Sequence, residues 1–296
     1  MQAVPYVVIF IPAYNEEKSI GGVIKKINDL YGNEKKIGFR TKILVVDDGS
    51  TDKTVEVASQ MGVSIVSHPQ NRGLGASTRT GLQRAFELGA DIAVKIDADF
   101  QHDPDDVFKV TKPIIGDKAD VVFGSRFMGE IEYKMPFYRR AGNLFFSYLV
   151  SKLTGLKITD GQTGLMAFSK NYLAKFNIIS DYNETQQLII DSWKNHMRIL
   201  EVPVVFHKRT EGTSFISFKY PFKVLPTLLR LLVQVKPLNI FLPLGLIFIL
   251  AGIVLCYFVV TNKVQFFGDA SIVMLIMGGI QIIIFGLLAD AISKRR

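Results

Sequence analysis

Two long stretches without a charged side chain lie near the C-terminal end of the chain. They cover residues 238–260 and 270–289, which are 23 and 20 residues long. An apolar helix of about 20 residues is long enough to cross a hydrocarbon core of about 30 Å. The sequence therefore predicts two membrane helices.

The residues before these stretches read as an ordinary water-soluble domain. Hydrophobic residues make up 48% of the chain and the mean hydropathy is +0.24, with the apolar excess near the C-terminus. Apolar runs at residues 7–11, 43–46 and 63–66 alternate with helical patterns such as residues 76–88. This alternation predicts an α/β domain with a mostly parallel sheet and helices on both faces, whose ligands bind beyond the carboxyl ends of the strands.

Basic residues set the expected orientation of the membrane helices. The net charge is +8, and the scatter of Lys and Arg favours anionic lipid over nucleic acid as the partner. Basic residues that flank the two stretches are Lys219, Lys223, Arg230, Lys236, Lys294, Arg295 and Arg296. The connecting loop holds only Lys263 and Asp269. The positive-inside rule therefore predicts a two-span protein with the first domain and both termini in the cytoplasm.

A mixed apolar and basic segment joins the two regions. Aromatic and aliphatic side chains in residues 215–235 interleave with Lys219, Lys223 and Arg230. This composition is typical of interfacial helices, broken near Pro221 and Pro226, although an amphipathic core helix would look similar. The expected division is residues 1–214 for a cytoplasmic domain, 215–236 for interfacial helices and 237–296 for a transmembrane hairpin.

Two carboxylates and an amide follow the apolar run that leads into residue 96. Asp97, Asp99 and Gln101 stand where a strand should end. Oxygen donors of this kind suit Mg²⁺ or Mn²⁺, which usually keep other coordination positions for water and substrate phosphates. The alternative is a set of solvated residues at a strand end, because a bare Asp-x-Asp is a weak motif.

A second acidic pair ends the strand at residues 43–46. We expect Asp48 to accept hydrogen bonds from the base or ribose of a nucleotide, whereas Ser50 and Asp52 are also good caps for the helix that follows. The glycines at residues 73–75 indicate a turn before a helix rather than a phosphate loop. His68 and His102 lack partners at metal-ligand spacing, which favours structural roles.

Four motifs in order resemble the signatures of family 2 glycosyltransferases. They are Pro12-Ala13-Tyr14-Asn15-Glu16, Asp47-Asp48-Gly49-Ser50-Thr51-Asp52, Asp97-Ala98-Asp99-Phe100-Gln101-His102 and Gly124-Ser125-Arg126. The chain is most similar to the branch of dolichyl-phosphate mannose synthases and polyprenyl-phosphate glycosyltransferases, over roughly residues 5–215. The resemblance implies a GT-A fold, a nucleotide-sugar donor, a divalent metal and a lipid phosphate acceptor.

The resemblance also implies a role for each matching residue. Residues implied to bind the nucleotide-sugar are Pro12, Tyr14, Glu16, Asp48, Asp97, Ala98 and Asp99. The metal, Mg²⁺ or Mn²⁺, would lie on Asp99 and Gln101. Residues implied to bind the acceptor phosphate are Arg126, Arg139, Arg209 and Ser214. The catalytic set would be Asp97, Asp99, Arg126 and Arg139. Guanidinium groups suit phosphate oxygens, which makes the arginines credible on chemistry alone, although solvated surface charge is their alternative.

The chain departs from the family pattern at a few positions. Phe215 and Leu74 stand where Lys is common, and Gln186 and Gln187 stand where the family often has Glu, for which Glu184 is a candidate substitute. These departures leave the reaction class intact and leave the sugar and the fine contacts to the acceptor undetermined.

The resemblance implies an inverting transfer of a sugar from GDP-mannose or a UDP-hexose to a polyprenyl phosphate, dolichyl or undecaprenyl. A phosphate monoester has a second pKa of about 6, so it needs little help from a general base. One alternative is a processive polysaccharide synthase, whose Gln-x-x-Arg-Trp motif is not found around the single Trp193. Another is a membrane protein that binds nucleotide-sugars without catalysis. Gly278, Gly279 and Gly286 are small enough to permit close helix contacts, which would allow a homo-oligomer.

Overall fold

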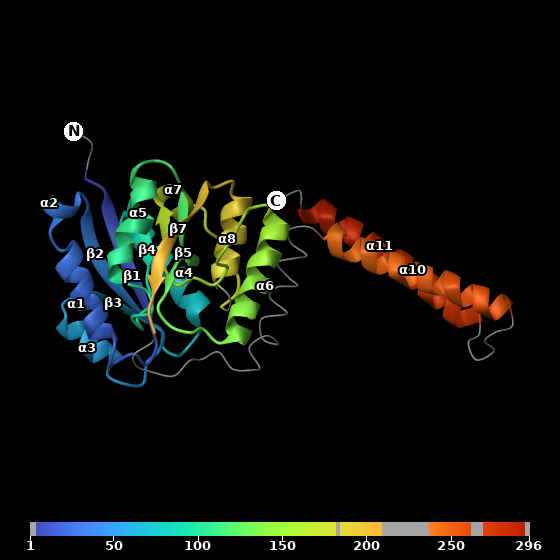
Figure 1. Ribbon diagram of the computed structural model, residues 1–296, viewed down its shortest axis with the longest axis horizontal. Helices are drawn as coiled ribbons and strands as arrows, with labels where there is room; N and C mark the ends of the chain where they lie inside the picture. The colour runs from blue at the N-terminus through green and yellow to red at the C-terminus, as the bar shows by residue number, and fades with distance from the viewer. Residues whose placement is uncertain (1–3, 182–183, 209–236, 262–268, 294–296) are drawn as a thin grey trace. The chain divides into compact units, whose positions relative to one another are not determined.

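The computed structural model describes residues 4–181, 184–208, 237–261 and 269–293 (Figure 1). The chain divides into two compact units, Met1–Tyr220 and Pro221–Arg296. The predicted interfacial segment at residues 215–236 lies outside the described residues, as do Arg209 and Ser214.

The first unit is built on a seven-stranded sheet with the order β3-β2-β1-β4-β6-β5-β7. The strands are β1 (Tyr6–Ala13), β2 (Arg40–Asp47), β3 (Ser64–Ser67), β4 (Ile92–Lys95), β5 (Val121–Ile131), β6 (Met166–Ser169) and β7 (Ile199–Phe206). Strand β6 runs antiparallel to both β4 and β5, and the other neighbouring pairs are parallel. The sheet is therefore mostly parallel, as predicted.

Helices cover both faces of this sheet (Figure 1). They are α1 (Ile20–Tyr31), α2 (Glu34–Ile37), α3 (Thr54–Gln60), α4 (Leu74–Glu87), α5 (Val107–Ile115), α6 (Phe137–Thr154), α7 (Lys170–Leu173) and α8 (Glu184–Lys194), with a 3₁₀ turn at Pro104–Asp106. On one face, apolar side chains of α1 and α5 pack against Ile9 and Ile11 of β1. On the other, Phe10 of β1 lies so close to Gly81 of α4 that a Cβ there would fall 2.2 Å from its ring.

Burial on both faces explains why the strands read as continuous apolar runs rather than alternating ones. All residues of β1 after Tyr6 are buried, and β1 is flanked by β2 and β4. The carboxyl ends of these three strands are Ala13, Asp47 and Lys95. The polar residues that follow each strand therefore emerge at one edge of the sheet, as the sequence predicted.

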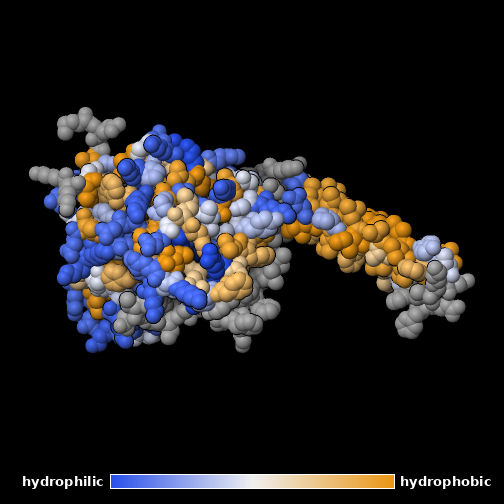
Figure 2. All heavy atoms as spheres, viewed as in Figure 1, coloured by the Kyte–Doolittle hydropathy of each residue, from blue (hydrophilic) through white to orange (hydrophobic). Residues whose placement is uncertain are grey.

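The second unit contains two described helices, α10 (Leu238–Val260) and α11 (Asp269–Ser293). Both are long and apolar enough to cross a membrane, and hydrophobic side chains cover them almost continuously (Figure 2). Glycines bring the two helices together: a Cβ on Gly279 would fall 2.6 Å from the carbonyl oxygen of Gly245, and one on Gly286 would fall 2.5 Å from Phe241.

This packing changes the interpretation of the glycines in α11. Gly279 and Gly286 were expected to permit contact between copies, but both are used inside the hairpin. A Cβ on Gly278 would meet nothing within 4 Å. The structure therefore explains two of the three glycines by contacts within one chain.

Candidate active site

The loops after β1 and β2 are joined to each other at the carboxyl edge of the sheet. The backbone N–H of Asn15 donates to Ser50 Oγ at 3.0 Å, and the N–H of Thr51 donates back to Asn15 Oδ1 at 2.8 Å. Ser50 thus links the two loops instead of capping α3. The N-cap residue of α3 is Lys53, and Asp52, one residue earlier, accepts the N–H of Thr54 at 2.9 Å.

The first predicted nucleotide residues lie in or beside these joined loops. Pro12 is buried in β1, whereas Tyr14 and Glu16 are partly exposed just beyond it. The backbone N–H of Glu16 donates to Thr54 Oγ1 at 2.8 Å, and its carboxylate accepts from Ser19 Oγ at 2.7 Å. Side-chain and backbone contacts from two elements therefore fix this part of the edge.

Asp48 is buried and holds the loop that leads into α4. Its carboxylate accepts the backbone N–H of Gly73 at 2.7 Å and that of Arg72 at 3.1 Å, and it lies 2.7 Å from His68 Nδ1. A carboxylate offers about four lone-pair sites, so three are already engaged by the protein. Asp48 thus has a structural role that the sequence did not reveal, and a nucleotide would have to share its oxygens.

The Asp97 carboxylate faces a buried lysine. Lys95, the last residue of β4, is fully buried, and its Nζ lies 2.7 Å from Asp97 Oδ1 and 3.7 Å from Glu184 Oε1. Burial alone would lower the pKa of Lys95, but the two facing carboxylates outweigh burial and raise it. Burial would likewise raise the pKa of Asp97, but the Lys95 ammonium, together with His102 and Arg126, outweighs burial and lowers that pKa. Asp97 is therefore held ionised and in place.

Gly164 packs directly against the same carboxylate. A Cβ on Gly164 would fall 1.9 Å from Asp97 Oδ2, which is far inside van der Waals contact. The backbone N–H of Gly164 also donates to His102 Nε2 at 3.0 Å. Only glycine fits here, so Asp97 is fixed by Lys95 at one oxygen and by Gly164 at the other.

The loop from Asp99 to His102 supplies the predicted metal ligands. Asp99 is buried, and its Oδ1 accepts the N–H of Gln101 at 3.0 Å. His102 is buried and neutral, because burial lowers its pKa to about 3. Its Nε2 accepts a hydrogen bond, which leaves the proton on Nδ1, a buried atom that meets no hydrogen-bond partner in the part of the chain that the structure describes.

This donor set fits a divalent ion on Asp99 and Gln101. Carboxylate and amide oxygens are the donors that Mg²⁺ and Mn²⁺ prefer. The Lys95 ammonium occupies one side of Asp97 and would repel a cation there. The described part of the chain shows no group of three His, Cys, Asp or Glu residues arranged for a metal. An ion at this place would thus need water and substrate oxygens to complete its coordination.

Arg126 belongs to a buried ion pair next to this site. Its Nε and Nη2 donate to the two oxygens of Asp160 at 2.6 and 2.8 Å, and Nη2 also donates to the carbonyl oxygen of Gln162 at 2.8 Å. Asn143 of α6 donates to the same Asp160 carboxylate at 3.0 Å. Gly164, two residues after Gln162, packs against the Asp97 carboxylate, so the ion pair lies beside the carboxylates.

Arg139 has a different environment. It lies in the first turn of α6, one turn before Asn143 and on the same helix face. Its Nε is buried and meets no acceptor among the described residues. A buried donor without a partner costs free energy, which is expected at a place where a ligand brings the acceptor.

The sequence singled out most of these residues, and residues 160–164 resemble the family's acceptor-side loop, but it did not reveal the three side chains or glycines that position the site. Lys95, Gly164 and Asp160 hold Asp97 and Arg126. A signal for the first was present, because Lys95 interrupts an apolar run two residues before Asp97. Glu184, considered as a substitute for a family glutamate, does reach the site through Lys95.

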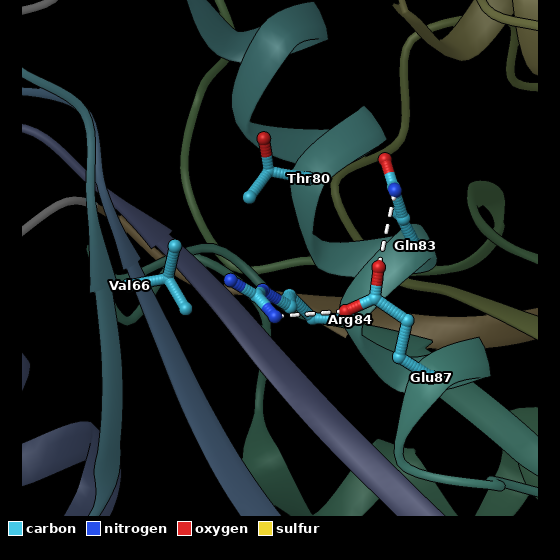
Figure 3. A pocket seen from close by; sticks show the side chains of 5 residues that line it. All are labelled: Val66, Thr80, Gln83, Arg84 and Glu87. Carbon is cyan, nitrogen blue, oxygen red and sulfur yellow. Dashed lines mark hydrogen bonds and ion pairs between the residues drawn. The ribbon is translucent and has the colours of Figure 1, made fainter.

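A hollow of about 220 Å³ lies elsewhere, between the edge strand β3 and α4. Its lining residues are Val66, Thr80, Gln83, Arg84 and Glu87 (Figure 3). Glu87 accepts from Gln83 at 3.1 Å and from Arg84 at 2.8 Å, so the polar groups of the rim pair with one another. None of the predicted site residues lines this hollow.

Comparison with known proteins identifies the family. The model described as "Glycosyl transferase family 2" matches residues 8–176, which is more than half of the chain. The chain belongs to glycosyltransferase family 2. A second model, "GtrB C-terminal hairpin", matches residues 236–294, so this glycosyltransferase carries its hairpin where α10 and α11 lie.

Individual relatives and structures agree with this assignment. The chain is 38% identical to a UDP-N-acetylglucosamine–dolichyl-phosphate N-acetylglucosaminyltransferase of Methanococcus voltae, over 73% of this chain and 94% of the relative. It is 25% identical to a dodecaprenyl-phosphate galacturonate synthase of Rhizobium johnstonii, over 97% and 87%. Glucosyl-3-phosphoglycerate synthase of Mycobacterium tuberculosis, solved with Mn²⁺ and UDP-glucose, superimposes with a TM-score of 0.62 at 23% identity, over 78% and 80%. This last likeness supports the GT-A fold.

Proposed function

We propose that this protein transfers a sugar from a nucleotide-sugar to a polyprenyl phosphate at the cytoplasmic face of a membrane, with inversion at the anomeric carbon. The observation that carries the proposal is that one loop, residues 160–164, contacts both Asp97 and Arg126: Gly164 packs against the Asp97 carboxylate, and Asp160 binds the Arg126 guanidinium. A site with acidic residues for a metal-bound diphosphate and arginines for a second phosphate suits a reaction between two phosphate-bearing substrates.

In this reaction an oxygen of the lipid phosphate bonds to the anomeric carbon, and the bond from that carbon to the diphosphate oxygen breaks. The nucleoside diphosphate leaves with the electron pair. The acceptor phosphate, with a second pKa of about 6, is largely dianionic near neutral pH and needs no general base. A divalent ion on Asp99 and Gln101 would neutralise the leaving diphosphate.

The protein residues position the two substrates. Arg139, whose buried Nε meets no described acceptor, would take the acceptor phosphate. Arg126, already held by Asp160, would contribute its charge and its remaining N–H donors. Asp97, fixed by Lys95, would face the sugar diphosphate without coordinating the metal through Oδ1. The nucleotide would lie over the joined loops that carry Tyr14 and Glu16.

A radiolabelled transfer assay tests the proposal. The full chain in proteoliposomes is given labelled UDP-N-acetylglucosamine, UDP-glucose or GDP-mannose with dolichyl or undecaprenyl phosphate, and label is counted in the organic extract. We expect transfer from UDP-N-acetylglucosamine first, in view of the named relative. A polymeric product would instead indicate a processive synthase, and binding without transfer would indicate a non-catalytic protein.

Metal dependence is tested at Asp99 in the same assay. We expect EDTA to abolish transfer, Mg²⁺ or Mn²⁺ to restore it, and Asp99→Ala to lower the rate by about 100-fold or more, because the leaving diphosphate loses its charge partner. Asp105→Ala, which changes an exposed carboxylate on the 3₁₀ turn, is the matched control. Near-normal transfer by Asp99→Ala with either ion supplied would refute the metal assignment.

A further inference from the structure

Helix α6 exposes an apolar face that the proposed transfer does not use. Its large exposed side chains, with their exposed fractions, are Phe137 (85%), Leu144 (50%), Phe145 (60%) and Tyr148 (63%). At 100° per residue these positions, with Ala141 and Lys152, fall within a stripe about 100° wide. The buried residues of α6, including Asn143, Phe146 and Val150, lie on the opposite side. The stripe is therefore a continuous outer face of one helix.

The charged residues of the segment that contains this stripe have a single sign. From residue 133 to residue 159 the chain has five basic residues and no acidic one. They are Lys134, Arg139, Arg140, Lys152 and Lys157. All but Arg139 are exposed. An apolar face with Phe and Tyr, bordered by exposed cations, is the composition of a helix that lies in a membrane interface.

We propose that the outer face of α6, here called the α6 stripe and made of Phe137, Ala141, Leu144, Phe145, Tyr148 and Lys152, docks on an anionic lipid surface. The same chain carries two helices that can cross a membrane, so the first unit is tethered where such a surface is available at high effective concentration. Basic residues near an anionic leaflet are attracted to it electrostatically. The apolar side chains would enter the boundary between headgroups and acyl chains.

Docking has a consequence for the acceptor, which rests on the proposed function. Arg139 lies on the inner side of α6, with Asn143 and the Asp160 loop. A lipid-bound α6 would therefore present Arg139 near headgroup level, where a polyprenyl phosphate carries its phosphate. The acceptor could then react without moving its apolar tail from the bilayer into water, which is unfavourable.

The test measures lipid contact directly and needs no turnover. In the full chain with Cys256→Ala, Tyr148→Cys is labelled with bimane and placed, one copy per disc, in nanodiscs that contain brominated lipids. Phe108→Cys, at an exposed apolar position of α5 (41% exposed), is the matched control. We expect several-fold stronger quenching at position 148 than at position 108, and stronger quenching in discs with phosphatidylglycerol than in neutral discs.

Each alternative has its own outcome. Equal quenching at the two positions would overturn the proposal. A blue-shifted but unquenched label at position 148 would show that protein covers the stripe and would also overturn it. The quenching experiment contains no nucleotide-sugar and requires no turnover. Its result therefore stands independently of the transfer assay. Phe145→Cys repeats the measurement if the first variant is unstable.

The contribution of the basic side chains to lipid contact is measured by reversing two charges near the C-terminal end of α6. With the label at position 148, the double change Lys152→Glu and Lys157→Glu should lower quenching several-fold in anionic discs and leave it nearly unchanged in neutral ones. Equal quenching before and after this reversal in anionic discs would contradict the electrostatic part of the proposal.

Discussion

At the scale of single residues, the charge balance of the site depends on Lys95. A fully buried ammonium with two carboxylate neighbours is costly unless every member is paired. Here the pairing fixes Asp97 in one rotamer and keeps it ionised. Lys95 is fully buried and acts on the site through Asp97, so it is a positioning residue.

We predict that Lys95→Met lowers transfer by about 100-fold and destabilises the first unit by roughly 2 kcal/mol. The stability loss is less than for a fully buried pair because the Asp97 side chain is 30% exposed. Without the ammonium the pKa of Asp97 should rise. When the pH is lowered, Asp97 of the variant should therefore become protonated, and transfer should be lost, at a higher pH than in the wild type. A pH profile of kcat/KM and a thermal melt measure both effects.

Glu184→Gln provides the control for Lys95. It removes only the longer contact of 3.7 Å and keeps the pair between Lys95 and Asp97. Its pH profile should stay close to that of the wild type. If Lys95→Met shifted stability but left the pH profile unchanged, Lys95 would be a purely structural residue.

A second prediction concerns Gly164. The change Gly164→Ala places a methyl group where Asp97 Oδ2 now lies, 1.9 Å away, so Asp97 must leave its position. We expect kcat to fall by about 10-fold or more, at a stability cost of about 1–3 kcal/mol. Gly142→Ala, where a Cβ meets nothing within 4 Å, should keep kcat and, if anything, raise stability. Steady-state kinetics and thermal unfolding of both variants measure the difference.

At the scale of elements, sequence periodicity was most informative where a strand or helix is long and uniformly buried. The apolar runs of β1 and β2 and the two uncharged stretches correspond closely to observed elements. Strand β6, four residues long and antiparallel, was not predicted, since its pairing with β4 and β5 is a tertiary contact that no local pattern announces.

The same limit applies to the site. The residue types at the strand ends predicted oxygen donors and phosphate-binding arginines. The partners that engage them could not be read from the sequence, because they come from distant segments: Gly73 for Asp48, Gly164 for Asp97 and Asp160 for Arg126. Such contacts decide which polar groups still have free hydrogen-bonding positions for a ligand.

A prediction at this scale concerns the contact between α10 and α11. The change Gly279→Leu would drive a side chain into the backbone of Gly245, 2.6 Å from the position of a Cβ. We expect overpacking to cost about 1–3 kcal/mol. Gly278→Leu, at a position open to 4 Å, should have little effect. Thermal unfolding of the full chain in detergent measures both, and equal midpoints for the two variants would contradict the close packing of the hairpin.

At the scale of the whole molecule, the proposed reaction requires a single arrangement of the chain with respect to the membrane. The nucleotide-sugar is a water-soluble donor, and the positive-inside rule assigns the basic flanks of α10 and α11 to the cytoplasm. The first unit precedes α10, so it should lie on the same side as both termini. The loop between the helices, with Lys263 and Asp269, should lie on the other side.

Accessibility of single cysteines in intact cells measures this arrangement. In a chain with Cys256→Ala, we expect Lys263→Cys to react with a membrane-impermeant maleimide added outside, because the loop should face away from the cytoplasm. Lys118→Cys, at an exposed position just before β5, should react only after the membrane is opened. The reverse pattern would put the catalytic unit outside, away from the cytoplasmic pool of nucleotide-sugars, and the proposed function would then lack its donor. Labelling at both positions in intact cells would show mixed insertion, which the strong asymmetry of basic flanks argues against.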